Sequence, residues 1–327
     1  MKIAPETLLL GIDIGGTKLG IGLGRADGTR LGEFRMPNVD TDPAEVLPAI
    51  VRESRRLAAE AGIEVKQIAA FGISAPFPAD AARGIMTKPT NNPKWRNVPI
   101  LDYLKGELAI DGCFENDANC AALAEFHFGA ARGCRNAIYL TLSTGIGGGV
   151  IANGRLVRGG ASLSAGEIGH ICLQLDGRLC SCGQRGCYEA YCGGRALAMR
   201  MREELANSPD SMIMRLAEGD PARIDMRTLE AAVRADDPYA RALWQEMSLR
   251  NAQAFGLLLN TFNPEKLVLG TLAWAIGDLY TAPIMEALPR FCWPQMRADC
   301  EIVPSALRRD ISSYAGIAAA LNYLAER

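Results

Sequence analysis

The chain has 327 residues, of which 49% are apolar and 22% charged, and its formal net charge is −2. This composition is that of a globular protein large enough for two lobes, and it offers no basic surface for nucleic acid. The sequence shows neither a signal-peptide pattern nor an apolar run of about 18 residues, so a cytoplasmic protein without a membrane partner is predicted.

The first element along the chain is a strand, a glycine turn and a returning strand. Apolar runs at Leu8–Ile14 and Leu19–Leu23 flank two adjacent glycines. Glycine lacks a Cβ, so backbone N–H groups at such a turn can approach a phosphate, and Asp13 is placed to hold a magnesium ion or its water shell. The candidate phosphate-binding residues are Asp13, Gly15, Gly16, Thr17 and Lys18. An ordinary hairpin turn is the alternative.

A second informative junction lies at Asn116 and Asp117, between a predicted strand at Gly112–Glu115 and a predicted helix at Ala118–Phe128. A helix N-terminus favours an ionised carboxylate. Phosphoryl transfer to a hydroxyl needs a group that orients it and accepts its proton, and Asp117 is our candidate for this base. Asn116 is expected to hydrogen-bond a neighbouring hydroxyl. The alternative is that Asp117 is only a helix cap.

Strands and helices alternate over the rest of the chain, which indicates an α/β fold. A second glycine turn follows the predicted strand Ala137–Leu142, and its candidate phosphate-binding residues are Thr144, Gly145, Gly147 and Gly148. Two such hairpins suggest a duplicated lobe. Further helices are predicted at Pro43–Ala61, Arg195–Ala206, Pro238–Phe262 and Ser312–Glu326, and further strands at Ile68–Ile73 and Lys266–Leu269.

A cluster of metal-ligating residues follows the second glycine turn. One histidine and three cysteines have the donor set of a closed, structural zinc site: His170, Cys180, Cys182 and Cys187. Free cysteines or a disulfide are the alternatives. A rigid metal loop would orient Glu167 and Glu189 towards a substrate, while both glycine turns are expected to lie elsewhere, so that metal loss would spare nucleotide binding.

Taken together, these motifs resemble the ROK family (repressors, open reading frames and kinases), and the first turn resembles the phosphate loop of the actin, hexokinase and heat-shock ATPase superfamily. The resemblance implies a two-lobed, ribonuclease-H-like fold with the active site in the interlobe cleft. Residues 1–115 with 311–327 would form one lobe and residues 116–310 the other. It also implies ATP as a substrate and a homodimer or homotetramer.

The resemblance assigns roles residue by residue. It makes Asp117 the catalytic base and His170 a residue shared by zinc and sugar. The sugar pocket it implies contains Ala75, Asn92, Asn116, Asp117, Glu167, His170 and Glu189. Leu267–Thr271 matches an adenosine-binding turn through Gly270, although Thr271 replaces a common glycine and leaves the base contact open.

The predicted activity is transfer of the γ-phosphate of ATP to the 6-hydroxyl of glucose. Kinases of N-acetylmannosamine or N-acetylglucosamine share these motifs, and the phosphoryl donor, ATP or polyphosphate, is left open. ROK regulators add an N-terminal DNA-binding domain, for which the position of Asp13 is expected to leave no room. An inactive sugar-binding module would have a damaged base or phosphate loop, and both are intact here.

Several other residues are predicted to be structural. His127 and Trp95 are expected to pack, and Cys172 and Cys192 to be small core residues. Ser208–Asp220 is expected to be a loop. Gly316 is expected to open the last helix and to face the cleft.

Overall fold

The computed structural model describes residues 3–77, 79–87 and 93–327, and the chain forms two compact units. Unit 1 comprises Met1–Tyr139, Gly149–Gly166 and Ser305–Arg327, and unit 2 comprises Leu140–Gly148 and Glu167–Pro304. The lobe boundaries predicted from the sequence, after residues 115 and 310, stay a prediction. In the structure, the segment that carries Asp117 belongs to unit 1.

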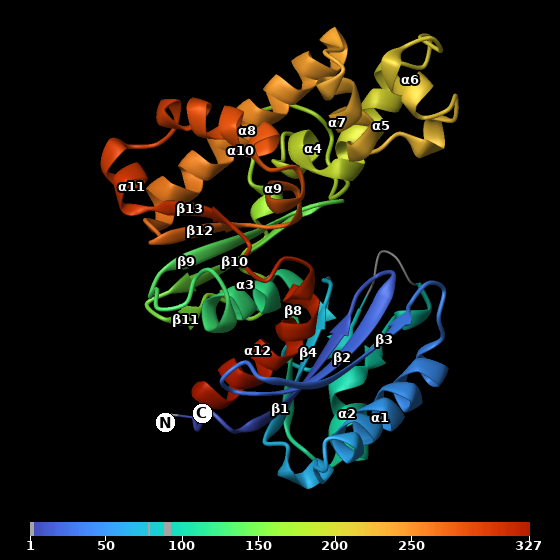
Figure 1. The fold of residues 1–327 in the computed structure, drawn as a ribbon, viewed down its shortest axis with the longest axis vertical. Helices are drawn as coiled ribbons and strands as arrows, with labels where there is room; N and C mark the ends of the chain where they lie inside the picture. Colours follow the sequence, from blue (N-terminus) through green and yellow to red (C-terminus); the bar gives the residue numbers. More distant parts are fainter. Residues whose placement is uncertain (1–2, 78, 88–92) are drawn as a thin grey trace. The chain divides into compact units, whose positions relative to one another are not determined.

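Strands and helices alternate as predicted, which confirms the α/β class (Figure 1). The strands are β1 Leu8–Ile14, β2 Lys18–Arg25, β3 Arg30–Pro37, β4 Ala70–Ala75, β5 Ala79–Asp80, β6 Ile85–Met86, β7 Val98–Pro99, β8 Gly112–Asn116, β9 Ala137–Leu142, β10 Ile146–Ala152, β11 Arg155–Leu156, β12 Lys266–Leu269 and β13 Glu301–Pro304. The helices are α1 Pro43–Glu60, α2 Ile100–Leu108, α3 Asp117–Phe128, α4 Glu189–Cys192, α5 Gly194–Glu204, α6 Met212–Leu216, α7 Met226–Arg234, α8 Pro238–Phe262, α9 Thr271–Ile276, α10 Asp278–Ala287, α11 Pro294–Asp299 and α12 Ile311–Ala325.

The sheet of unit 1 has the strand order β3-β2-β1-β4-β8. β1 pairs antiparallel with β2 and parallel with β4, and β4 pairs parallel with β8. Alternate residues of β1 face opposite sides. Leu10 and Ile12 pack with helices α1 and α2, whereas Leu9 packs with α12. Because parallel strands end at one edge, this order brings the C-terminal ends of β1, β4 and β8 together (Figure 1).

Helix α12 approaches this sheet closely because glycines meet at the contact. A Cβ built on Gly316 would lie 2.4 Å from the Ile12 nitrogen, 2.6 Å from the Gly11 Cα and 2.7 Å from the Gly72 oxygen. Gly316 is therefore an interior residue of α12 that packs against β1 and β4. Our expectation that it opens the helix and faces a cleft is wrong.

A second sheet repeats the order of the first, as β11-β10-β9-β12-β13. The antiparallel pair β10–β11 corresponds to β2–β3, and the parallel pair β12–β13 corresponds to β4–β8. The duplication predicted from two glycine hairpins is thus visible in the sheet topology. Each hairpin occupies the same place in its own sheet.

Helix α8 forms much of the core of unit 2, and Asp237 caps its N-terminus by accepting from the Ala240 N–H. Most of its large apolar side chains are buried, but Phe262, at its end, is 42% exposed. The predicted loop at Ser208–Asp220 contains helix α6, which Ser211 caps. A short helix after a capping serine is easily missed because it is too short to show a period.

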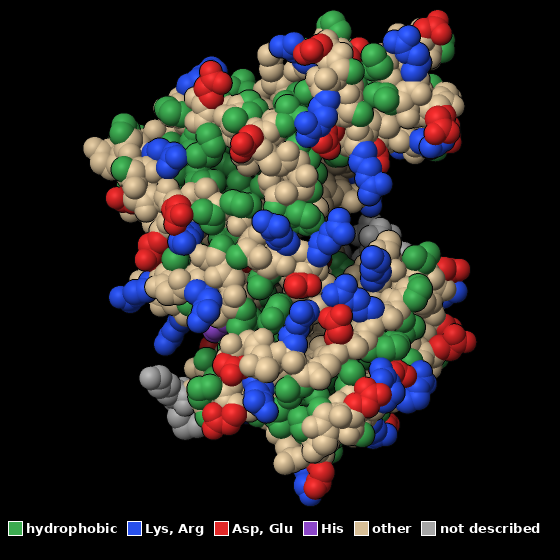
Figure 2. Space-filling model, viewed as in Figure 1, with side chains coloured by type: hydrophobic (Ala, Val, Ile, Leu, Met, Phe, Trp, Pro, Cys, Tyr) green, Lys and Arg blue, Asp and Glu red, His purple; other side chains and the backbone are tan. Residues whose placement is uncertain are grey.

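Among the residues that the structure describes, no helix has the length and apolar character needed to cross a bilayer. On the face shown in Figure 2, basic and acidic side chains are interspersed. This agrees with the nearly balanced formal charge of the chain.

Candidate active site

The first glycine turn connects β1 to β2 in unit 1. The Gly15 N–H donates to the Lys18 carbonyl at 2.9 Å, and the Asn38 side chain donates to the Gly15 carbonyl at 2.7 Å. A Cβ on Gly15 would lie 3.1 Å from the Lys18 oxygen, so a side chain there would crowd the turn. Thr17 and Lys18 are exposed. The backbone is thus fixed while both side chains are available to a ligand.

Asp13 lies at the end of β1, opposite Ser74 of β4. The Ser74 hydroxyl donates to Asp13 Oδ1 at 2.7 Å. Loss of hydration raises the pKa of Asp13 to about 7, and the negative charge of Asp117 adds to this rise, whereas the Ser74 hydrogen bond and Arg35 oppose it. The charge of Asp117 thus disfavours the ionised form of Asp13, and a divalent cation at this place would favour it.

Asn116, and not Asp117, caps helix α3. Asn116 Oδ1 accepts from the N–H groups of Ala118 at 2.8 Å and Asn119 at 3.2 Å. Asp117 is the first residue of the helix, and its Oδ1 also accepts from the Ala118 N–H at 2.8 Å. The Asp117 side chain is exposed, yet lost hydration still raises its pKa. Asn116 is therefore the N-cap of α3, and the role of Asp117 as catalytic base stays a prediction.

The second glycine turn connects β9 to β10 and is held by the segment that follows the metal ligands. Glu189 Oε2 accepts from the Ile146 N–H at 2.8 Å, and the Arg195 N–H donates to the Thr144 carbonyl at 2.9 Å. A Cβ on Gly145 would lie 2.7 Å from Glu189 Oε2. A side chain at position 145 would therefore displace the Glu189 carboxylate from this place.

The four predicted metal ligands lie together in unit 2. Their ligand atoms are all within 4.8 Å of one another. Cys180 Sγ is 3.7 Å from His170 Nδ1, and Cys182 Sγ is 3.7 Å from Cys187 Sγ. A tetrahedral zinc ion with Zn–S bonds of about 2.3 Å would separate two sulfurs by about 3.8 Å. The donor set and its spacing therefore fit zinc, and the two thiols are not joined in a disulfide.

Glycines and a buried tyrosine shape this metal loop. Gly183 and Gly186 have φ values of 92° and 80°, and a Cβ on Gly186 would lie 1.8 Å from the Gln174 oxygen. Tyr188 is fully buried, and its hydroxyl donates to Asn251 Oδ1 of helix α8 at 2.5 Å. The loop is therefore anchored to the core of unit 2 immediately after its last ligand.

The metal loop and the second glycine turn are in direct contact. Glu189 binds the Ile146 N–H, and a Cβ on Gly169 would lie 2.2 Å from the Ile146 oxygen. The expectation that the glycine turns lie away from the metal loop is thus wrong for the second turn. We predicted that loss of the metal would leave nucleotide binding unchanged. This no longer follows, because Glu189 joins the metal loop to the second glycine turn.

The remaining predicted site residues have different settings. Ala75 ends β4, is buried and lies opposite Asn116 of β8 in the register. Gly270 donates its N–H to the Leu140 carbonyl at 2.8 Å and precedes helix α9, which begins at Thr271. Glu167 is exposed and precedes the short helical turn Ile168–His170. Asn92 lies outside the described residues.

The structural predictions for single residues have mixed outcomes. Trp95 is fully buried, His127 is largely buried and Cys192 is buried, as predicted. Cys172 is exposed, so its assignment to the core is wrong. It lies opposite Cys187 in a two-residue antiparallel bridge at the surface of the metal loop, where an apolar residue is not required.

Three supporting residues were not predicted from the sequence. Ser74, Asn38 and Glu115 form hydrogen bonds with predicted site residues. Ser74 bonds Asp13, and Asn38 bonds the first glycine turn. The Glu115 carboxylate accepts from the Asn116 N–H at 3.0 Å. A signal was available only for Ser74, since it directly follows the predicted strand Ile68–Ile73.

Comparison with known proteins identifies the family. The ROK family model matches residues 9–323. The chain belongs to the ROK family. This confirms the resemblance drawn from the glycine turns, the Asn116–Asp117 junction and the cysteine cluster.

Relatives that match this ROK protein over nearly its whole length include sugar kinases. It is 33% identical over 327 residues to a glucokinase of Thermotoga maritima, covering 99% of both chains. It resembles the structure of a ROK hexokinase from Thermus thermophilus with a TM-score of 0.86 and 30% identity, over 98% of this chain and 100% of that one. A ROK glucokinase from Streptomyces griseus in complex with glucose and AMPPNP matches with a TM-score of 0.74 and 30% identity, over 96% and 99% of the two chains.

Proposed function

We propose that this ROK protein is a cytoplasmic sugar kinase that transfers the γ-phosphate of ATP to the 6-hydroxyl of glucose. The observation that carries the proposal is the exposed carboxylate of Asp117, which follows the capping residue Asn116 and lies near Asp13. The likeness to the Thermotoga maritima glucokinase and to the glucose- and AMPPNP-bound Streptomyces griseus enzyme supports the choice of substrates.

Asp117 would accept the proton of the sugar hydroxyl while the hydroxyl oxygen attacks the γ-phosphorus and the bond to the β-phosphate oxygen breaks. The N-terminus of helix α3 favours the ionised carboxylate that this step requires. Asn116 uses its Oδ1 atom to cap the helix. Its Nδ2 group would donate to a neighbouring hydroxyl and so orient the sugar.

Both glycine turns would bind the phosphates through their backbone and hydroxyl groups. The proposed residues are Asp13, Gly15, Gly16, Thr17, Lys18, Thr144, Gly145, Gly147 and Gly148, with Gly270 near the adenosine. Asp13 would hold Mg²⁺ directly or through its water, and Mg²⁺ would supply positive charge to the transferred phosphate. The raised pKa of Asp13 is consistent with a carboxylate whose charge is balanced only when a cation binds.

The cysteine cluster would hold a structural Zn²⁺ through His170 and the three thiolates. Bound zinc would stiffen the loop on which Glu167, His170 and Glu189 would contact sugar hydroxyls, together with the backbone at Ala75.

The decisive experiment measures sugar-phosphate formation with glucose, mannose, N-acetylmannosamine, N-acetylglucosamine, fructose and allose, each with ATP and with polyphosphate. The highest kcat/KM is expected for glucose with ATP. A higher value for an N-acetylhexosamine would change the assigned sugar. Absence of sugar phosphate with every sugar and both donors would reject the kinase proposal. Light scattering would test the proposed homodimer or homotetramer.

A further inference from the structure

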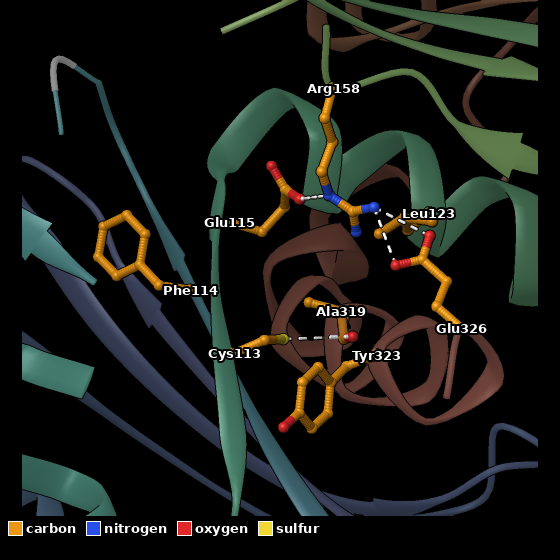
Figure 3. Close-up of a pocket in the computed structure, with 8 residues that line it drawn as sticks. All are labelled: Cys113, Phe114, Glu115, Leu123, Arg158, Ala319, Tyr323 and Glu326. Carbon is orange, nitrogen blue, oxygen red and sulfur yellow. Dashed lines mark hydrogen bonds and ion pairs between the residues drawn. The ribbon is translucent and has the colours of Figure 1, made fainter. Parts of the chain in front are cut away.

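Two linked ion pairs in unit 1 line a cavity of about 140 Å³ (Figure 3). They lie next to the junction of β8 and α3, where Asp117 is the first helical residue. Arg158 lies between Glu115, near the end of β8, and Glu326, just past the end of α12. Arg158 Nε donates to Glu115 Oε2 at 2.6 Å, and Arg158 Nη1 donates to both Glu326 oxygens at 2.9 Å. The Arg158 side chain is 25% exposed and that of Glu115 only 5%.

The second oxygen of Glu115 binds the residues on both sides of Asp117. Glu115 Oε1 accepts from the Asn116 N–H at 3.0 Å and from Asn119 Nδ2 at 2.8 Å. One buried carboxylate thereby ties the end of strand β8 to the first turn of helix α3. The direction of the Asp117 side chain depends on the geometry of this turn.

A carboxylate as buried as Glu115 keeps its charge and its place only if a positive group compensates it. Asn116 and Asn119 contribute neutral donors, whereas Arg158 contributes the positive charge. Glu326 in turn fixes the Arg158 guanidinium with two hydrogen bonds, which limits its rotation. Removing the Arg158 guanidinium would leave the buried Glu115 carboxylate uncompensated and favour its rotation towards solvent, which would alter its hold on the turn.

We propose that Arg158, acting through Glu115 and itself held by Glu326, is a positioning residue for the catalytic base of this kinase. The inference rests on the proposed function, because it assigns Arg158 a part in the orientation of Asp117. Arg158 contacts neither glycine turn in the bonds described above. Its loss should therefore lower turnover and leave ATP binding nearly unchanged.

The test compares Arg158→Met and Arg158→Lys with the wild type. Arg158→Met should lower kcat about tenfold in the folded protein, the scale expected when a reacting group is misplaced by a fraction of an ångström. The KM for ATP should change less than about twofold, since the same geometric argument leaves the nucleotide turns in place. Arg158→Lys keeps the charge and should restore part of kcat. Amide hydrogen exchange at Ala118 and Asn119 should accelerate in Arg158→Met.

Arg200→Met is the matched control. Arg200 is also partly buried and also bridges two carboxylates, those of Glu204 and Glu246 in unit 2. It should cost comparable thermal stability without the loss of kcat. An unchanged kcat and unchanged exchange in Arg158→Met, or an equal kcat loss in Arg200→Met, would overturn the proposal.

Two further arms complete the test. If Arg158→Met does not fold, Glu326→Ala replaces it, and a fall of kcat with an unchanged KM for ATP supports the proposal while an unchanged kcat overturns it. If the wild type phosphorylates no sugar, the proposed function fails, but exchange at Ala118 and Asn119 still decides whether Arg158 holds the turn.

Discussion

At the scale of single residues, the N-terminus of helix α3 uses neighbouring side chains for two roles. Asn116 caps the helix, and Asp117 is the proposed catalytic base. Asn116 satisfies the N–H groups of Ala118 and Asn119. Asp117 follows at the first helical position with an exposed carboxylate. A carboxylate that is exposed at this position can face a substrate, which is the physical basis of the proposed mechanism.

Asp117→Asn keeps the shape of the side chain but removes its capacity to accept a proton. We expect kcat to fall by at least about 10²-fold, the usual scale for the loss of a general base. Glucose binding measured by calorimetry should persist, and the melting temperature should stay near that of the wild type because Asn116 still caps the helix. Near-normal turnover would require a different base.

His127 has a pH effect on stability whose sign follows from its burial. Burial lowers its pKa to about 4, and its Nε2 atom has no hydrogen-bond partner among the described residues. The unfolded chain takes up this proton near pH 6.5, whereas the folded protein takes it up only near pH 4. The stabilisation is therefore complete above pH 6.5 and is lost as the pH falls towards 4, by roughly 3 kcal/mol in total.

His127→Phe removes this titration, and the flanking Phe126 and Phe128 rings show that aromatic side chains fit nearby. Urea unfolding at pH 7 and pH 4.5 measures the effect. The wild type should lose more stability than the variant between these values. Equal losses in both proteins would show that His127 does not titrate in this range.

At the scale of elements, the contact of α12 with the first sheet depends on glycines from three segments. Gly316→Ala would place a Cβ 2.4 Å from a backbone nitrogen of β1. The helix must then move away, and we expect a loss of about 2 kcal/mol of unfolding free energy, as is usual for overpacking. Urea denaturation monitored by circular dichroism measures this loss.

Gly106→Ala is the control for that substitution. Gly106 also lies in a helix, α2, but a Cβ there meets nothing within 4 Å. Alanine is the better helix former, so stability should rise by up to about 1 kcal/mol. A stable Gly316→Ala variant would mean that α12 tolerates a wider spacing from the sheet than the structure indicates.

The metal loop is the second element whose integrity can be tested. Purified protein should contain about one zinc per chain, as four protein ligands imply. Cys182→Ser should weaken metal binding, raise the sugar KM and lower kcat. It should also raise the KM for ATP, because Glu189, which follows the ligands, holds the Ile146 N–H of the second glycine turn.

Cys172→Ser is the matched control, since Cys172 lies on the same loop, is exposed and is not one of the four ligands. It should keep its zinc and its kinetics. Elemental analysis and thiol titration provide readouts apart from activity. A fully active wild type without zinc would refute the structural role of the metal.

At the scale of the whole molecule, two units carry different parts of the proposed site. Asp13, Asp117 and the first glycine turn belong to unit 1, whereas the second glycine turn and the metal loop belong to unit 2. Each sheet presents its glycine hairpin at the same place in the strand order. A ligand that binds the native state but not the unfolded chain stabilises the protein against unfolding, so glucose and ATP binding can be tested through stability.

Glucose and a non-hydrolysable ATP analogue should each raise the melting temperature. At a concentration of about 100 times Kd, one ligand adds about 2.7 kcal/mol to the unfolding free energy. Differential scanning fluorimetry across the sugar panel should rank glucose first. A larger shift with N-acetylmannosamine or N-acetylglucosamine would point to a 2-acetamido pocket instead, and Asp117→Asn should keep the glucose shift.

The features that the sequence by itself determined are those set by neighbours along the chain. The glycine turns follow from the missing Cβ at Gly15 and Gly145, and the cluster of possible metal ligands follows from the spacing of His170 and the three cysteines. The strand-to-helix junction at Asp117 is equally local, because strand and capping signals lie within a few residues of it.

Only the tertiary structure decided which distant residues meet these motifs. Ser74 reaches Asp13 across 61 residues, and Glu326 reaches Arg158 across 168. The contact of Glu189 with Ile146 joins two motifs that the sequence treats as separate. Strand register and helix packing fix these pairs. Periodicity along the chain indicates which face of an element is apolar, but not which distant element it meets, because that contact depends on the whole fold rather than on adjacent residues.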